Sequence, residues 1–222
     1  MTPLIDRILP FCLYMAFVAV PEIGSRSGLF EISAHTAAAL YPLKIGLVGL
    51  SLLWLWKRYD ELRWSELART RDTLLSLGLG AAVFLLWINL DLPFATMGAS
   101  QGFDPNQFGG LRLPMIAVRL FGAAVIVPVM EELFWRSFLT RYLVDKNFTA
   151  VRHGTFTLFT FTATAVLFGL EHHLWLAGIL AGAAYNYIYM RTGSVVQCVV
   201  SHGLTNLLLG GYVLVTGRWL FW

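Results

Sequence analysis

The stretch that decides the fold of this chain is Val127-Pro128-Val129-Met130-Glu131-Glu132-Leu133-Phe134-Trp135-Arg136. It holds two adjacent carboxylates and one arginine in a segment that is otherwise apolar enough to lie in a lipid bilayer. A charge at membrane depth is costly unless it faces a protein interior or a water-filled cavity and has a partner there. We therefore expect these three charged side chains to face the inside of a bundle of membrane helices.

The composition of the whole chain supports a membrane protein. Of its 222 residues, 57% are apolar or aromatic and 13% are charged, whereas a soluble domain carries about 25% charged residues. The basic residues stand in small groups between apolar stretches, a pattern that does not indicate a nucleic-acid partner. Cys12 and Cys198 both lie in apolar runs, so neither a disulfide nor a redox site is expected. We predict one membrane-embedded domain over residues 1–222.

Apolar segments divide the chain into predicted transmembrane helices. A helix that crosses a bilayer needs about 20 mostly apolar residues. The predicted fold class is therefore all-α, a polytopic bundle of seven spans, or of eight if one segment is re-entrant or split. The predicted spans are 5–20, 36–56, 73–90, 112–144, 155–170, 174–190 and 195–216.

The distribution of basic residues predicts the orientation of this bundle. Loops that carry an excess of Lys and Arg face the cytoplasm. The loop 57–71 holds five basic residues, and Arg141, Lys146 and Arg152 follow in the turn after the fourth span. We predict that both loops, and with them the N-terminus, are cytoplasmic.

The two carboxylates of the opening stretch point in different directions on a helix. Residues four apart share a helix face, so Glu132 and Arg136 are expected to form a pair. Glu131 is rotated by about 100° from Glu132. This rotation leaves Glu131 free to face a different helix, where its carboxylate is able to act as a general base.

Two later spans repeat the same spacing with other polar residues. Phe168 and His172 are four apart at the end of the fifth span, and His202 and Asn206 are four apart in the seventh. Each pattern alone has a structural explanation, because buried ion pairs, histidines and amides also connect helices in membrane bundles. All three patterns occur in this order on three apolar helices. A shared functional site explains this combination better than three separate structural roles do.

The three patterns resemble the motifs of the CAAX protease and bacteriocin-processing family of intramembrane proteases, which includes the type II CAAX prenyl endopeptidases. The corresponding residues are Glu131-Glu132-Leu133-Phe134-Trp135-Arg136, Phe168-Gly169-Leu170-Glu171-His172 and His202-Gly203-Leu204-Thr205-Asn206. The motif-bearing core lies within about 112–216. Pro21-Glu22-Ile23 is also similar to a bacterial subgroup found beside exosortase sorting systems.

The resemblance implies an endopeptidase in a bacterial inner membrane. It implies that Glu131 and His172 activate a water molecule against a peptide bond, and that His202 and Asn206 hold the oxyanion. The implied substrate is a hydrophobic or membrane-anchored peptide, and the family name suggests a prenylated CAAX-like one. Supporting roles fall to Glu132, Arg136 and Phe168.

The resemblance leaves two questions open: whether the site uses a metal, and which histidine is the partner of Glu131. The family has been described both as metalloproteases and as metal-free glutamate proteases, and a zinc site here would use Glu131, His172 and His202. Glu171 occupies a position that is usually small in the family. It is placed either to orient His172 or to displace it in favour of His173. Counting along the spans also places His172 nearer the outer surface than Glu131.

Three other classes of protein compete with the protease. A non-catalytic scaffold or immunity-type protein would retain the same polar cluster, and it remains the main alternative. A transporter would show an inverted repeat, and the sequence has none. Gly98-Ala99-Ser100-Gln101-Gly102 fits the serine-hydrolase pattern but has no preceding strand, so we interpret it as a loop. The oligomeric state is not predicted.

Overall fold

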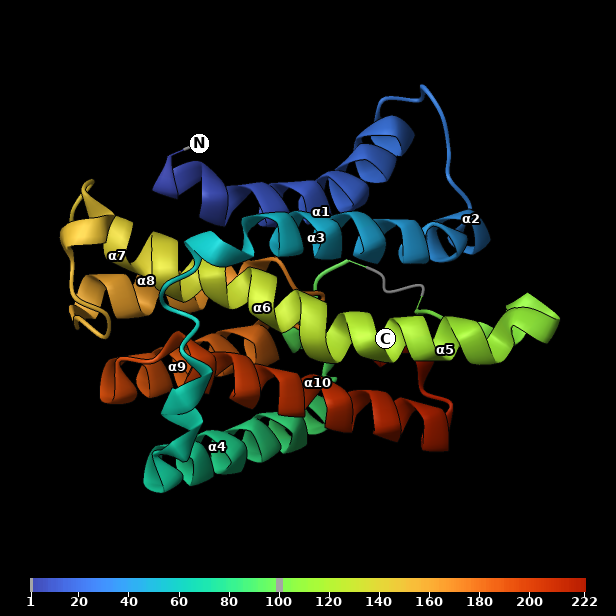
Figure 1. The fold of residues 1–222 in the computed structure, drawn as a ribbon. Helices are drawn as coiled ribbons and strands as arrows, with labels where there is room; N and C mark the ends of the chain where they lie inside the picture. Colours follow the sequence, from blue (N-terminus) through green and yellow to red (C-terminus); the bar gives the residue numbers. More distant parts are fainter. Residues whose placement is uncertain (1, 99–101) are drawn as a thin grey trace.

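The computed structural model describes residues 2–98 and 102–222, and throughout them the regular secondary structure is helical (Figure 1). This confirms the predicted all-α class. The middle three residues of the Gly-x-Ser-x-Gly pattern, 99–101, lie outside the described residues. The α-helices are α1 (Pro3–Arg26), α2 (Ala34–Ala39), α3 (Tyr41–Leu55), α4 (Thr70–Asn89), α5 (Arg112–Phe121), α6 (Val127–Glu132), α7 (Thr140–Tyr142), α8 (Leu158–Leu170), α9 (Trp175–Thr192) and α10 (Val195–Thr216).

Shorter helical pieces connect these helices. Two π-helical segments, Gly122–Ile126 and Leu133–Leu139, join α5, α6 and α7 into one helix over residues 112–142. In these segments an N–H bonds the carbonyl five residues back, as Val127 does to Gly122, and such insertions often occur at functional sites. The remaining pieces are 3₁₀ turns at Trp56–Arg58, Trp64–Ala68, Pro93–Ala95, Pro105–Leu111, Phe148–Ala150 and Trp219–Phe221.

Each predicted span coincides with a helix or a run of helices. By length and composition, five helical stretches are able to cross a membrane: Pro3–Arg26, His35–Arg58, Thr70–Asn89, Pro105–Tyr142 and Val195–Thr216. The helix α8 has only 13 residues and is therefore about 20 Å long, shorter than the ~30 Å hydrocarbon core. The chain is an integral membrane protein, and the number of seven or eight spans stays a prediction.

Local sequence explains where the last three helices begin and end. The side chain of Thr157 caps the start of α8 by accepting from the N–H of Thr160, and Ser194 caps α10 in the same way. Such caps satisfy N–H groups that have no partner inside the helix. At the C-terminal ends of α9 and α10, Gly193 and Gly217 adopt φ angles of 66° and 69°, which glycine accommodates without strain.

The α8–α9 hairpin packs through small residues. A Cβ atom at Gly178 would lie 2.8 Å from the Cα of Gly169, and one at Gly182 would lie 3.0 Å from the Cα of Ala165. Glycines four apart on one helix allow this close backbone approach in membrane bundles. The hairpin therefore holds the end of α8 close against α9.

The stretch 127–136 lies at the centre of the bundle. In Figure 1, α6 runs between the α1–α3 pair on one side and α10 on the other, with α4 beyond α10. Every residue of the stretch is buried except Phe134, which is half-buried. The expectation that its three charged side chains face the interior of the bundle is confirmed.

A substitution on α4 tests the close packing of this helix on α10. A Cβ atom at Gly80 would lie 2.5 Å from the backbone oxygen of Ser201, whereas one at Gly78 would meet nothing within 4 Å. We expect Gly80→Ala to lower the thermal unfolding temperature in detergent, since overpacking destabilises by about 1–3 kcal/mol. Gly78→Ala is the control and should be neutral or stabilising, because alanine is the better helix former. Equal melting temperatures for the two variants would contradict the packing.

Candidate active site

One cavity of about 170 Å³ is lined by all four residues that the sequence analysis assigned to catalysis, Glu131, His172, His202 and Asn206. Its walls come from α1, α3, α4, α8, α9 and α10 and from the helix that contains α5 and α6. The structure thus brings together polar groups that are up to 75 residues apart in the sequence, from Glu131 to Asn206.

Glu131 carries a carboxylate oxygen that has no partner. The residue is 7% exposed, and its Oε2 forms no hydrogen bond. The nearest nitrogen of a basic side chain is the Nε2 of His202, at 3.9 Å, which is beyond hydrogen-bond distance. A buried acceptor without a donor is unfavourable, and this oxygen lies in the wall of the cavity. It is therefore available to accept a proton from a molecule inside.

His172 also presents a free nitrogen to the cavity. Its Nδ1 lies 2.7 Å from the carbonyl oxygen of Phe168. A carbonyl only accepts, so this contact assigns the proton to Nδ1 and leaves Nε2 as an acceptor in the neutral ring. The rings of Phe168 and Trp87 lie 4.9 Å and 5.3 Å from the imidazole and fix its plane.

His202 is held by a carboxylate and an aromatic ring. Its Nδ1 lies 2.9 Å from the Oε1 of Glu132, and its ring stacks on Tyr185 with centroids 4.9 Å apart. One turn further, the Nδ2 of Asn206 donates to the carbonyl of Ala123 at 2.8 Å. This bond uses one of the two N–H groups of the amide and leaves the other for a ligand.

Glu132 and Arg136 form the predicted ion pair. The Nε of Arg136 lies 3.2 Å from the Oε2 of Glu132, and the two side chains are 1% and 0% exposed. The guanidinium also donates to the backbone oxygen of Gly182. It lies over the rings of Phe168 and Tyr185, with its Cζ 5.0 Å and 5.4 Å from their centroids. The sequence analysis predicted this pair but missed the second contact of Glu132, to His202.

Of the three neighbouring residues Glu171, His172 and His173, only His172 lines the cavity. His173 does not line the cavity, because its Nδ1 contacts the carbonyl of Met97 at 2.7 Å. The carboxylate of Glu171 accepts from the indole N–H of Trp135 at 3.0 Å. His172 therefore shares the cavity with Glu131, and its role as the partner of Glu131 stays a prediction. The expected difference in depth between His172 and Glu131 stays a prediction, although both residues line one cavity.

The cavity is also lined by an arginine that no sequence motif singled out. Arg119 lines the cavity, its buried Nε has no hydrogen-bond partner, and within residues 2–98 and 102–222 no carboxylate lies within 4 Å of it. Its guanidinium carbon lies 4.5 Å from the ring centroid of Tyr41. A signal was present in the sequence, because Arg119 precedes Glu131 in the same apolar segment.

The residues as arranged do not form a metal site. Among the residues that the structure describes, no three His, Cys, Asp or Glu side chains are grouped closely enough to hold an ion. The Nδ1 of His202 already contacts Glu132, and its Nε2 is 3.9 Å from Glu131. Zinc with Glu131, His172 and His202 as ligands stays a prediction of the resemblance, and no chemical step below is assigned to it.

The contribution of the buried Glu132–Arg136 pair to stability can be measured against that of an exposed pair. Arg136→Met leaves the carboxylate of Glu132 buried with its cation removed, and breaking a buried pair in this way costs about 3–5 kcal/mol. Arg26→Met breaks the exposed pair with Glu22, whose side chains are 80% and 61% exposed, and should cost less than about 1 kcal/mol. Thermal unfolding in detergent would measure both. A similar loss for the two variants would contradict the assigned role of Arg136.

Comparison with known proteins finds a match for the part of the chain that carries the four predicted catalytic residues. Residues 113–208 match the family model described as type II CAAX prenyl endopeptidase Rce1-like. No curated protein and no solved structure matches the chain. The likeness of Pro21-Glu22-Ile23 to a subgroup lies outside the matched segment and stays a prediction. The matched segment contains all three motifs, and its family is one of proteases. Over residues 113–208, which is less than half of its length, the chain is therefore similar to the Rce1-like family of type II CAAX prenyl endopeptidases.

Proposed function

We propose that this protein is an intramembrane endopeptidase that hydrolyses a peptide bond with a water molecule activated by Glu131 and His172. The observation that carries the proposal is the convergence of Glu131, His172, His202 and Asn206 on one cavity, with the Oε2 of Glu131 unpartnered. The family match supports the same class of reaction. We also propose that it acts in a bacterial inner membrane with its N-terminus in the cytoplasm.

The free acceptor atoms suit the activation of water. The Oε2 of Glu131 removes a proton as the water oxygen attacks the carbonyl carbon of the substrate, and the Nε2 of His172 accepts the second hydrogen bond of that water. The C–N bond then breaks, and the proton held by Glu131 passes to the leaving amine. The sequence of steps adds one water across one peptide bond.

Three donors are placed for the oxyanion that forms in the same step. His202 is oriented by the contact of its Nδ1 with Glu132, and in the protonated imidazole both ring nitrogens donate, so that Nε2 would donate toward the cavity. Asn206 has one N–H group left after its bond to Ala123. Arg119 adds a positive charge to the same wall. Donors fixed before the reaction lower the energy of the transition state most effectively.

The surroundings of the cavity favour a substrate with an apolar anchor. A groove of about 530 Å³ between α1 and α3 is lined mainly by apolar side chains, among them Phe17, Val20 and Leu40. Tyr41 lies in the wall of both the groove and the cavity. We propose that a prenyl or other lipid chain, or an apolar peptide segment, occupies this groove while the peptide bond enters the cavity.

The assignment of Glu131 as the general base has a direct test. We expect Glu131→Gln to lower the cleavage of a farnesylated CAAX-type peptide by about 10²–10⁴-fold, since the amide does not accept the proton of the water. The melting temperature should stay close to that of the wild type, because the side chain keeps its shape. Glu22→Gln, an exposed carboxylate, is the control. Retained cleavage in Glu131→Gln would exclude the assignment, and an unchanged cellular phenotype would favour the scaffold alternative.

The adjacent histidines provide a second, matched comparison. We expect His172→Gln to reduce cleavage strongly, because it removes the free imidazole nitrogen from the cavity. His173→Gln should retain most of the activity, since His173 contacts the loop at Met97 and does not line the cavity. Initial rates with the same peptide decide between them. The opposite order of activities would transfer the role to His173.

A further inference from the structure

A second cavity, of about 560 Å³, lies at the end of the bundle where α1 begins and α7 ends. Its lining includes residues of the 59–69 connection, the 147–153 connection and the turn between α9 and α10. None of its lining residues lines the cavity of Glu131. By the predicted orientation it opens to the cytoplasm, where the head groups of the inner leaflet lie.

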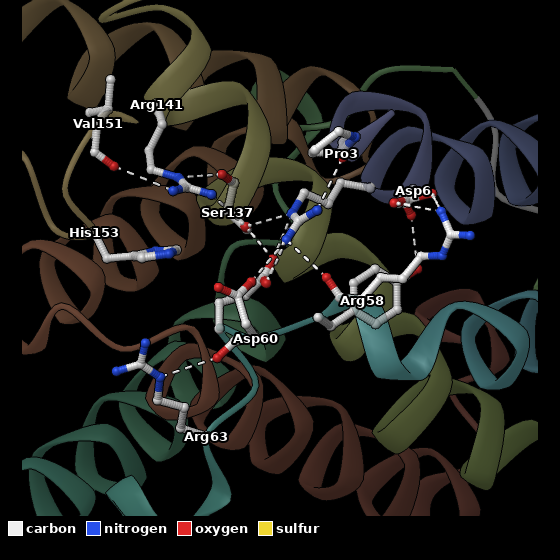
Figure 2. A network of polar contacts seen from close by, with 12 residues as sticks. Pro3, Asp6, Arg58, Asp60, Arg63, Ser137, Arg141, Val151 and His153 are labelled. Atoms are coloured by element: carbon white, nitrogen blue, oxygen red, sulfur yellow. Dashed lines mark hydrogen bonds and ion pairs between the residues drawn. The ribbon is translucent and has the colours of Figure 1, made fainter. Parts of the chain in front are cut away.

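A buried network of charges forms the floor of this cavity (Figure 2). The guanidinium of Arg7 donates to both carboxylate oxygens of Glu61, at 2.8 Å and 2.7 Å. The hydroxyl of Ser137 donates to Glu61 and accepts from Arg141. Arg7, Arg141 and Glu61 are each 5% exposed. The floor therefore holds two buried cations and one buried carboxylate, which is paired with Arg7, and these three groups carry a net charge of +1.

Arg141 is the cation without an anionic partner. It donates to the backbone and hydroxyl oxygens of Ser137 and to the carbonyl of Val151, and all three acceptors are neutral. In the described parts of the chain, no carboxylate lies within 4 Å of its guanidinium. A guanidinium has five N–H groups, so its hydrogen bonds leave donors available in the wall of the cavity.

The rim of the cavity adds more positive than negative charge. Arg63, Arg69 and Arg152 are exposed and line it, and the acidic residues there are Asp60 and Glu66. Arg69 pairs with Glu66 at 3.3 Å. The side chain of Asp60 is 87% exposed and lies 3.4 Å from Arg7. Arg63 contacts Asp60 only through the backbone oxygen. Arg63 and Arg152 therefore remain without a carboxylate within 4 Å in the described residues.

A histidine in the same wall adds no charge at neutral pH. The Nδ1 of His153 contacts the hydroxyl of Tyr189 at 2.9 Å. Burial, together with the nearby charge of Arg141, lowers the pKa of His153 to about 4. The ring is thus neutral near pH 7, and the positive potential of the cavity comes from its arginines alone.

We propose that this cavity binds a phosphate group, with Arg141 at its base and Arg63 and Arg152 at its mouth. Guanidinium groups recognise phosphate oxygens through paired, charge-assisted hydrogen bonds. A phosphate would supply the anion that Arg141 lacks. Basic pockets between membrane helices on the cytoplasmic side are suited to anionic lipid head groups, and a soluble phosphate has the same chemistry.

Thermal unfolding of the purified full-length protein in detergent tests the proposal. The probes are dioctanoyl phosphatidylglycerol, inorganic phosphate and, as a lipid without phosphate, dioctanoylglycerol, with sodium chloride at matched ionic strength. A ligand of the folded state raises the melting temperature in a saturable way. We expect phosphatidylglycerol, phosphate or both to do so, and dioctanoylglycerol and salt not to. A response to the lipid alone assigns a head-group site, and a response to inorganic phosphate assigns a soluble source.

Variants at the mouth locate the site. Arg63→Gln and Arg152→Gln replace exposed side chains, so both proteins should fold, and their melting temperatures without ligand check this. Each substitution should raise the half-saturating ligand concentration about tenfold, because the loss of one charge-assisted hydrogen bond weakens binding by about that factor. Arg71→Gln, exposed at the same end but outside the lining, should leave it unchanged. The proposal is overturned by the absence of a saturable response, by an equal response to dioctanoylglycerol, or by unaltered half-saturation in both mouth variants.

Discussion

The interior of this bundle depends on the carboxylate of Glu132. It is 0% exposed and meets Arg136 on its own helix and His202 on α10. Arg136 extends the connection to the backbone of Gly182 on α9. A buried charge is tolerated when an opposite charge and hydrogen bonds compensate for its removal from water. A rotation of α10 about its own axis would remove one of these partners. The need of the Glu132 carboxylate for positively charged or donor partners therefore fixes how α6, α9 and α10 are rotated relative to one another.

The sequence was sufficient to predict the helices and to predict that the main polar residues belong to one site. Apolar runs predicted seven helical segments because a bilayer requires them. The spacing of Glu132 and Arg136 predicted a pair because the helix geometry is local. The convergence of Glu131 with the histidine-bearing helices was an inference from the cost of burying all of them. None of these steps needed knowledge of how helices pack.

Other features depend on tertiary packing and were not accessible in this way. That His172 and not His173 lines the cavity depends on the turn after α8, where the backbones of Gly178 and Gly169 approach each other closely. The contact between Glu132 and His202 depends on the relative rotation of α6 and α10. Arg119 lines the cavity from a helix that continues into the π-helical segment Gly122–Ile126, and no spacing rule for a regular α-helix predicts such an insertion.

The length of α8 determines where His172 lies relative to the cavity. Each residue in an α-helix advances the chain by about 1.5 Å and turns it by about 100°. The segment between the Thr157 cap and the turn at 171–174 holds 13 helical residues. One residue more or less would swing His172 out of the cavity and bring a neighbouring side chain toward Glu131. Between Thr157 and His172 the number of residues is therefore as constrained as the type of residue at each position. We expect insertions to be tolerated in the connection before Thr157 but not between Thr157 and His172.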